Sequence, residues 1–296
     1  MTVNITYLGP QGTFCGEAAQ AWARSAPTIK KSALLPLATL EDIVASVGQN
    51  GDTFGVVPLE NSREGSVGLT LDLLAEARGI RICGEVIIPV AHYLFAPPGI
   101  AAEEIEEIHS HPQALAQSRP FILQKFPGIK EVPHLSTAEA VADVARRGGR
   151  KGALGARGSG SLYGLEMLMP VEGRSCLNNK TRFIVLGKED SPPTGRDKTS
   201  LLFTVEAGPG RLYHILELFA REEIDLCKIE SRPTKKELGE YIFFLDFVGH
   251  RLEAKAAPVL EEVKRRAPYV KILGSYPAYI ERSGDNNNSK LDAGIK

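Results

Sequence analysis

The sequence predicts an α/β protein with a second, smaller C-terminal domain of ferredoxin-like topology. Across residues 1–188 short apolar runs alternate with helical patterns, an order typical of α/β layers around a largely parallel sheet. Beyond residue 198 the order becomes strand-helix-strand-strand-helix-strand, which is the split βαβ arrangement. A chain of 296 residues is long enough for both domains.

The elements of the first domain follow from local patterns. Apolar runs bounded by Gly and Pro indicate strands, and Thr-x-x-Asp or Ser-x-x-Glu ahead of an apolar stripe indicates the start of a helix. Strands are therefore expected at residues 4–8, 54–58 and 183–186, and helices after residue 13, after 39–42 and after 136–139, the last one ending at Gly148.

A Pro-, Gly- and charge-rich segment at residues 188–198 predicts a linker between the two domains. The second domain is expected to place strands near residues 201–205, 224–230, 241–248 and 270–274, and helices near residues 212–220 and 254–266. The resulting domain prediction is 1–188, 198–280 and a disordered tail at 281–296.

The composition is that of an ordinary soluble globular protein, with 43% hydrophobic and 24% charged residues. A net charge of -1 argues against nucleic acid or an anionic membrane surface as the main partner. The N-terminus shows no leader pattern, and no apolar run approaches the roughly 20 residues that span a bilayer. The four cysteines lack metal-ligand spacing, so free thiols in a cytoplasmic protein are expected: Cys15, Cys83, Cys176 and Cys227.

The most informative stretch is Thr181-Arg182-Phe183, where a loop at residues 175–180 enters an apolar strand. It supplies a hydroxyl, a fixed cation and a flat apolar face, a set that suits a small anionic ring compound. A threonine hydroxyl is a poor proton donor, so Thr181 is expected to donate a hydrogen bond to a leaving oxygen. Arg182 is open to two interpretations, a bidentate contact with a carboxylate or a surface ion pair.

Two segments that follow strands could face the same cleft, and each also has a plainer interpretation. Thr13 and Phe14 lie between a strand and a helix, where backbone N–H groups could hold a carboxylate or where Thr13 could simply cap the helix. Asn61, Ser62 and Ser66 follow a strand, where open α/β sheets bind ligands, although a plain turn fits equally well.

A third segment, His111, Gln113 and Ala114, begins a helix that has Pro112 at its first position. His111 is either an acid or ligand contact, or a structural helix cap. The chain carries no Walker loop, no Rossmann glycine fingerprint and no nucleophile elbow, so no cofactor motif is present.

Taken in order, these segments resemble the prephenate dehydratase family. The first domain matches through residues 9–14 (GPQGTF), 57–62 (VPLENS), 65–67 (GSV), 110–115 (SHPQAL) and 179–183 (NKTRF). The second domain resembles the ACT regulatory domain attached to that family through residues 198–203 (KTSLLF), 209–210 (PG) and 230–233 (ESRP). The resemblance covers residues 4–280, and although each motif alone is weak, the ordered set is highly specific.

The resemblance implies a two-lobed α/β catalytic domain, similar to type-2 periplasmic binding proteins, with the active site between the lobes. Residues 1–82 and 170–188 are then expected in one lobe and the intervening segment in the other. The implied reaction removes water and carbon dioxide from prephenate to give phenylpyruvate, on the route to phenylalanine. It needs no cofactor, because aromatisation drives it, and catalysis consists of holding a dianion while the ring hydroxyl leaves.

The resemblance also implies roles for individual residues. Thr181 matches the catalytic threonine, and the residues that match substrate-binding or supporting positions are Thr13, Phe14, Asn61, Ser62, Ser66, His111, Gln113, Ala114, Arg182 and Phe183, with the role of Arg182 left open. Phenylalanine is the implied feedback inhibitor, bound where two ACT domains meet in a homodimer or homotetramer. The implied effector-binding residues are Gly210, Leu212, Glu230, Ser231, Arg232 and Pro233. With no chorismate mutase segment ahead of residue 1, a monofunctional enzyme is expected.

Two other functions stay open on the sequence alone. Arogenate dehydratase performs the same chemistry on the transaminated substrate, and only relative turnover separates the two. A non-catalytic amino-acid sensor would keep the same fold. The departures from the family pattern that suggest the sensor are Cys15 for serine, Ser175 for aspartate and Gly155-Ala156 for a small-Ile-Ala-Ser strand ending. Ser118 for a common cysteine and Arg211 for alanine are further departures.

Overall fold

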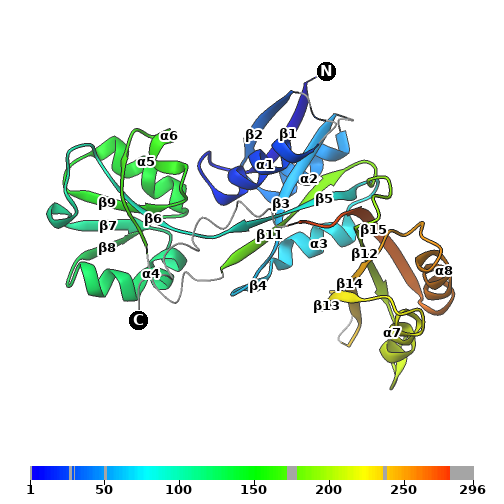
Figure 1. Ribbon diagram of the computed structural model, residues 1–296. Coiled ribbons are helices and arrows are strands. Elements are labelled where there is room, and N and C mark those ends of the chain that lie inside the picture. The colour runs from blue at the N-terminus through cyan, green and yellow to red at the C-terminus, as the bar shows by residue number, and fades with distance from the viewer. Residues whose placement is uncertain are drawn as a thin grey trace, which may run out of the picture.

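The computed structural model describes residues 2–26, 29, 31–49, 52–171, 179–235 and 239–280. It contains two α/β lobes and a C-terminal domain, and the first lobe lies between the other two (Figure 1). The predicted tail at 281–296, Ser175 and Cys176 lie outside the described residues. No helix in the described part of the chain has both the length and the apolar character needed to cross a membrane.

The first lobe is a mixed sheet with helices on both faces. Its strands, in spatial order, are β2 (Ser32–Leu37), β1 (Val3–Leu8), β3 (Thr53–Asn61), β11 (Lys180–Gly187) and β5 (Arg81–Pro89), and β4 (Gly65–Ser66) pairs with β3. One face packs on α1 (Phe14–Ser25), and the other packs on α2 (Leu40–Gln49) and α3 (Gly68–Glu76). Successive side chains of β11 point to opposite faces of the sheet. Phe183 and Val185 pack on the α1 side, and Ile184 and Leu186 pack on the side of α2 and α3.

The second lobe holds a five-stranded sheet. Its strands, in spatial order, are β10 (Glu166–Pro170), β6 (Tyr93–Ala96), β9 (Lys151–Gly155), β7 (Glu107–Ser110) and β8 (Lys130–Pro133). Its helices are α4 (Pro112–Lys125), α5 (Thr137–Arg147), α6 (Ser159–Leu162) and a short 3-10 turn, η1 (Ala102–Glu104). The predicted start and end of α5 are confirmed, because the Glu139 backbone N–H donates to Ser136 Oγ at 3.0 Å and the helix ends at Gly148. The Glu139 carboxylate accepts from the Leu135 N–H at 3.0 Å, so only the Ser136 half of the expected capping box is formed.

Both sheets are mixed, which corrects the expectation of a largely parallel sheet. Strands β2, β1 and β3 pair in parallel, as do β8, β7 and β9. The chain leaves the first lobe through β5 and returns through β11, which therefore pairs antiparallel with both β3 and β5. Since β5 stays in the first sheet, the lobe boundary falls after Pro89, not near residue 82 as expected.

The C-terminal domain confirms the predicted ferredoxin-like order. Its antiparallel sheet runs β13 (Leu226–Pro233), β14 (Tyr241–Val248), β12 (Asp197–Thr204) and β15 (Tyr269–Pro277), with α7 (Arg211–Arg221) and α8 (Ala256–Arg266) on one face. The other face shares a hydrophobic core with the first lobe through Leu202, Phe244 and Tyr276. At Gly274 the approach is so close that a Cβ would collide with the backbone of Ile82. This domain is therefore packed onto the first lobe as one continuous core.

One buried hydroxyl in the second lobe gives a stability prediction. Ser118 of α4 is 1% exposed, and its Oγ has no hydrogen-bond partner among the described residues. We expect Ser118→Ala to raise the free energy of unfolding by about 1 kcal/mol, because it removes an unsatisfied buried group and suits a helix better. Urea denaturation measures this change.

Ser110 is the matched control, because it is equally buried but its Oγ donates to the Leu154 carbonyl at 2.9 Å. Ser110→Ala is expected to lower stability by about 1 kcal/mol. If both alanine variants lose stability equally, the description of Ser118 as unsatisfied is wrong.

Candidate functional site

Thr181 and Asn61 lie opposite each other on neighbouring strands. Asn61 is the last residue of β3, and its Nδ2 donates to Thr181 Oγ1 at 2.8 Å and to Asn179 Oδ1 at 2.9 Å. Its Oδ1 accepts from the backbone N–H groups of Arg63 and Glu64 at 2.9 and 3.1 Å, which fixes the amide in a side-chain turn. Because an amide nitrogen only donates, Thr181 Oγ1 is the acceptor and its own proton remains available for another oxygen.

Strand β11 begins at Lys180, so Thr181 lies inside the strand and not in the loop ahead of it. The expected strand at 183–186 was too short, because backbone pairing with β5 extends to Lys180 opposite Pro89. Ser62 completes this end of the sheet. Its backbone N–H donates to the Lys180 carbonyl at 2.9 Å, and its Oγ accepts from the Lys180 N–H at 3.0 Å. Thr181, Asn61 and Ser62 are thus brought together, and a paired strand holds them in place.

Gln117 of α4, which sequence reasoning missed, connects this cluster to the second lobe. Its Nε2 donates to Glu64 Oε1 at 3.2 Å, and its Oε1 accepts from Asn179 Nδ2 at 3.4 Å. Gln117 stands one helical turn after Gln113, so the two lie on the same face of α4. The four-residue spacing from Gln113 is the sequence signal that could have identified Gln117 as a site residue.

A second set of contacts joins the lobes at the start of α1. Tyr163 Oη donates to the Gln11 carbonyl at 3.1 Å, and the Phe14 ring meets the edge of His92 at a centroid distance of 5.6 Å. Burial lowers the pKa of His92 to about 4, so this ring is neutral near pH 7. At Gly12 the φ of 90° disfavours any other residue, and an added Cβ would also lie tightly against Ser159, 3.3 Å from its Cβ.

Thr13 and His111 both cap helices. Thr13 Oγ1 donates to the Leu8 carbonyl at 3.0 Å and accepts from the Gly16 N–H at 3.3 Å. His111 Nδ1 accepts from the Gln113 N–H at 3.3 Å at the start of α4. Ala114 is buried next to this cap, and Gln113 is exposed. Within the described residues no hydrogen bond joins Thr13 or His111 to Thr181.

Phe183 and Ser66 make their contacts away from the Thr181–Asn61 pair. Phe183 is 1% exposed and packs in the core beneath α1 with Trp22. The Oγ of Ser66 contacts the carboxylate of Glu230 and accepts from Lys228 Nζ at 2.8 Å, so it meets the C-terminal domain. Phe183 packs between the first sheet and α1, and Ser66 belongs to the junction with the C-terminal domain.

Arg182 is the centre of a buried ion cluster between the first lobe and the C-terminal domain. It is 8% exposed, so the expectation of a surface ion pair is corrected. The four side chains that accept hydrogen bonds from its guanidinium are Glu85 at 2.7 Å, Asp246 at 2.7 Å, Tyr276 at 2.8 Å and Glu60 at 3.1 Å. We refer to these five residues as the Arg182 cluster, and Lys198 Nζ adds a second cation 2.8 Å from Glu85.

Electrostatics within the Arg182 cluster favour the ionised forms of Glu85 and Glu60. Burial alone would raise the pKa of Glu85, but the charges of Arg182 and Lys198 outweigh it and hold that pKa below the ordinary 4.5. The pKa of Glu60 is also lowered, since Lys228 and Arg182 overcome the effect of burial. The accepting oxygens around Arg182 come from both sides of the domain junction.

The residues expected to bind an effector fall into two groups on different elements. Gly210 caps α7 with φ of 77°, and Leu212 follows it. On β13 the side chains alternate, so that Glu230 and Arg232 face the first lobe while Ser231 and Pro233 are exposed. Arg232 Nη2 is 3.0 Å from both carboxylate oxygens of Asp72 on α3. In the described chain no hydrogen bond links these two groups.

Comparison with known proteins gives a consistent picture. The family model for prephenate dehydratase matches residues 5–191. The bifunctional chorismate mutase/prephenate dehydratase of Aquifex aeolicus is 39% identical over 277 residues, which cover 93% of this chain and 74% of that protein. The prephenate dehydratase of Methanocaldococcus jannaschii is 41% identical over 246 residues, covering 81% and 86%.

Solved structures with similar folds are described with two different activities. Prephenate dehydratase from Arthrobacter aurescens, in complex with L-Phe, aligns with a TM-score of 0.83 at 33% identity over 93% of this chain and 90% of that one. GqqA, described as a novel type of quorum quenching acylase, aligns with a TM-score of 0.81 at 29% identity over 94% and 98%. Fold similarity alone therefore does not separate the two activities.

Proposed function

Since this chain belongs to the prephenate dehydratase family, we propose that it converts prephenate to phenylpyruvate, carbon dioxide and water. The observation that carries the proposal is the fixed pair of Asn61 and Thr181, in which the amide holds the threonine oxygen and leaves its proton to donate. Both residues come from the ordered motif set, and the structure joins them from strands 120 positions apart in the sequence.

In the proposed reaction Thr181 donates a hydrogen bond to the ring hydroxyl as that group departs. The ring carboxylate leaves as carbon dioxide, the electrons of the broken C–C bond form the aromatic ring, and the C–O bond breaks, so that the departing hydroxide takes up a proton from solvent and leaves as water. A single preorganised donor is a sufficient catalyst for such a step, because it stabilises the negative charge that develops on the leaving oxygen. The bond from Asn61 polarises the Thr181 hydroxyl and makes it a better donor.

The proposed substrate is a dianion, and two features support its binding near α1. The backbone N–H groups at the start of this helix carry partial positive charge, which favours a carboxylate. Phe14 is held against His92 at the same place and offers an apolar edge. Cys15 takes no part as a nucleophile, because burial raises the pKa of its thiol to about 12. No cofactor is included in the proposal.

We also propose that L-phenylalanine binds the C-terminal domain at the junction of two chains. The relative from Arthrobacter aurescens was solved with L-Phe. Within one chain the Gly210–Leu212 group and the β13 group stand on separate elements, and in the proposed homodimer or homotetramer the site combines the group of one chain with that of another. The three described cysteines Cys15, Cys83 and Cys227 are free, which supports a reducing, cytoplasmic location.

Steady-state assays with prephenate, arogenate and an acyl substrate test the function. Phenylpyruvate formation from prephenate at a higher kcat/KM than phenylalanine formation from arogenate is the expected result. Preference for arogenate would reassign the substrate, and acyl hydrolysis without dehydration would replace the proposal. L-Phe binding measured by calorimetry without turnover of any of them would identify a sensor.

A further inference from the structure

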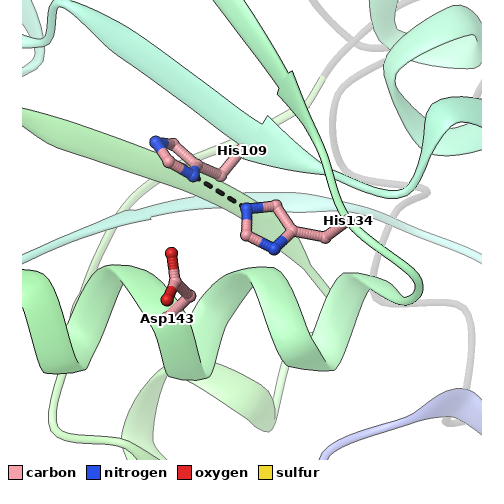
Figure 2. A group of neighbouring side chains, drawn as sticks. All are labelled: His109, His134 and Asp143. Atoms are coloured by element: carbon pink, nitrogen blue, oxygen red, sulfur yellow. Dashed lines mark hydrogen bonds between the residues drawn. The ribbon is translucent and has the colours of Figure 1, made fainter.

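Two histidines and an aspartate meet in the second lobe, outside the set of residues proposed to act on prephenate. His109 lies on β7 and is 3% exposed, His134 follows β8 and is half-buried, and Asp143 lies on α5 and is 8% exposed. His109 Nδ1 is 2.9 Å from His134 Nε2, and one potential ligand atom from each of the three residues lies within 4.8 Å of the other two. Figure 2 shows the Asp143 carboxylate pointing from its helix toward the two rings.

A fourth residue orients the buried histidine in a way typical of metal sites. Glu107 Oε2 lies 3.1 Å from His109 Nε2. A carboxylate accepts, so the Nε2 atom carries the proton and the Nδ1 lone pair faces His134 and Asp143. Metal-binding histidines commonly donate their second ring N–H to a carboxylate in this manner. In the metal-free chain His134 Nε2 then supplies the shared proton, which a cation would displace.

We propose that His109 Nδ1, His134 Nε2 and one Asp143 oxygen bind a divalent transition-metal ion. Two imidazole nitrogens and a carboxylate oxygen are a donor set that suits Zn²⁺ and does not suit Mg²⁺ or Ca²⁺. With metal–ligand bonds of about 2.0–2.2 Å, tetrahedral ligand atoms lie roughly 3.3–3.5 Å apart. The histidine pair must therefore open slightly and Asp143 must approach, which small side-chain rotations achieve.

Neighbouring basic side chains compete with the ion for the carboxylates and so affect the affinity of the site for metal. Asp143 pairs with Arg146 at 2.5 Å and with Arg147 at 2.9 Å, and their side chains are 75% and 59% exposed. Both arginine side chains can turn toward solvent when the ion binds. The Asp143 oxygen that does not bind the ion can still pair with one of them. Lys130, paired with Glu107 at 2.8 Å, is also exposed. His134 is only half-buried, so the proposed ion can reach this residue from solvent.

The ion would join three elements that the fold brings together. It ties β7, the connection after β8 and α5 to one another, and β7 ends at Ser110, two residues before α4 begins. The direct consequence is a more stable second lobe.

Calorimetry with Zn²⁺ and absorption spectroscopy with Co²⁺, on the whole chain stripped with a chelator, test the site. One equivalent of each metal is expected to bind, and Zn²⁺ at 100 times its Kd should raise Tm by about 5–10 °C. His134→Asn should abolish both effects, and Glu107→Gln should weaken binding by about 10- to 100-fold. His134 is half-buried, so its replacement should leave the fold intact in circular dichroism.

Glu106→Gln is the matched control, because Glu106 is the adjacent acidic residue and pairs with Arg150 at 2.9 Å, away from the histidines. It should bind Zn²⁺ as the wild type does. Unchanged binding in His134→Asn, or a sulfur-to-cobalt charge-transfer band, would assign the metal to other residues and overturn the proposal. Absence of stoichiometric binding by the wild type would overturn it as well.

Discussion

Replacing Thr181 by alanine is expected to lower kcat for prephenate by about 10²- to 10³-fold while KM changes little. The lost hydroxyl donates to the departing oxygen, whose charge develops in the transition state, so ground-state binding is hardly affected. The measurement is the steady-state rate of phenylpyruvate formation over a range of prephenate concentrations.

Three further variants make this result specific. Thr181→Ser keeps the hydroxyl and should retain most of the activity. Thr70→Ala removes another buried threonine hydroxyl, one that donates to the Pro58 carbonyl at 2.7 Å, and should leave kcat unchanged. Asn61→Ala alone should lower kcat. Added to Thr181→Ala, it should have little further effect, because the two residues act as a unit. Full activity in Thr181→Ala would contradict the mechanism.

Local elements of the fold could be predicted because their signals lie within a few residues of one another. The helix cap at residue 39 is an example, since the Asp42 N–H donates to Thr39 Oγ1 at 3.1 Å as the spacing implies. Strand direction could not be predicted in this way. Strand β11 enters the first sheet between β3 and β5, whose residues stand about a hundred positions earlier, and no local pattern encodes that insertion.

The part of the candidate site that could be predicted is the part in which residues of two recognised motifs contact each other. The pairing of Thr181 with Asn61 joins two segments that the sequence had already singled out. The direction of the Arg182 side chain could not be predicted, because it depends on which face of β11 the residue takes and on acids from distant segments. Glu60 and Glu85 lie on the two neighbouring strands of the same sheet, and Asp246 lies in the C-terminal sheet. Glu85 offered a signal, since it is the charged residue inside the apolar run Ile82–Ile88.

The position of Arg182 links the proposed catalytic residue to the C-terminal domain. Thr181 and Arg182 are consecutive on β11, and the guanidinium of Arg182 contacts Asp246 of β14 and Tyr276 of β15. The C-terminal domain therefore contributes directly to holding the strand that carries Thr181. A substrate carboxylate would have to displace one of these protein oxygens to reach the guanidinium, so Arg182 is better explained as a structural cation than as a substrate ligand.

Arg182→Met is therefore expected to lower the free energy of unfolding by about 3–5 kcal/mol, because it leaves the carboxylates of Glu85 and Asp246 buried without their main cation. Urea denaturation of the whole chain measures the loss. Arg251→Met is the matched control. Arg251 pairs with Asp190 at 2.6 Å beside the same domain, but its side chain is 36% exposed, so the expected loss is at most about 1 kcal/mol.

The pH dependence distinguishes a lost charge from lost packing. In the wild type the pKa of Glu85 lies below its ordinary 4.5, so the stability it contributes is present above about pH 4.5 and is lost as the pH falls through the lowered value. In Arg182→Met, protonation of Glu85 instead relieves a buried charge. The difference in stability between wild type and variant should therefore shrink as the pH is lowered toward 4. A constant difference would indicate lost packing alone, and a raised KM for prephenate with unchanged stability would show that Arg182 binds the substrate.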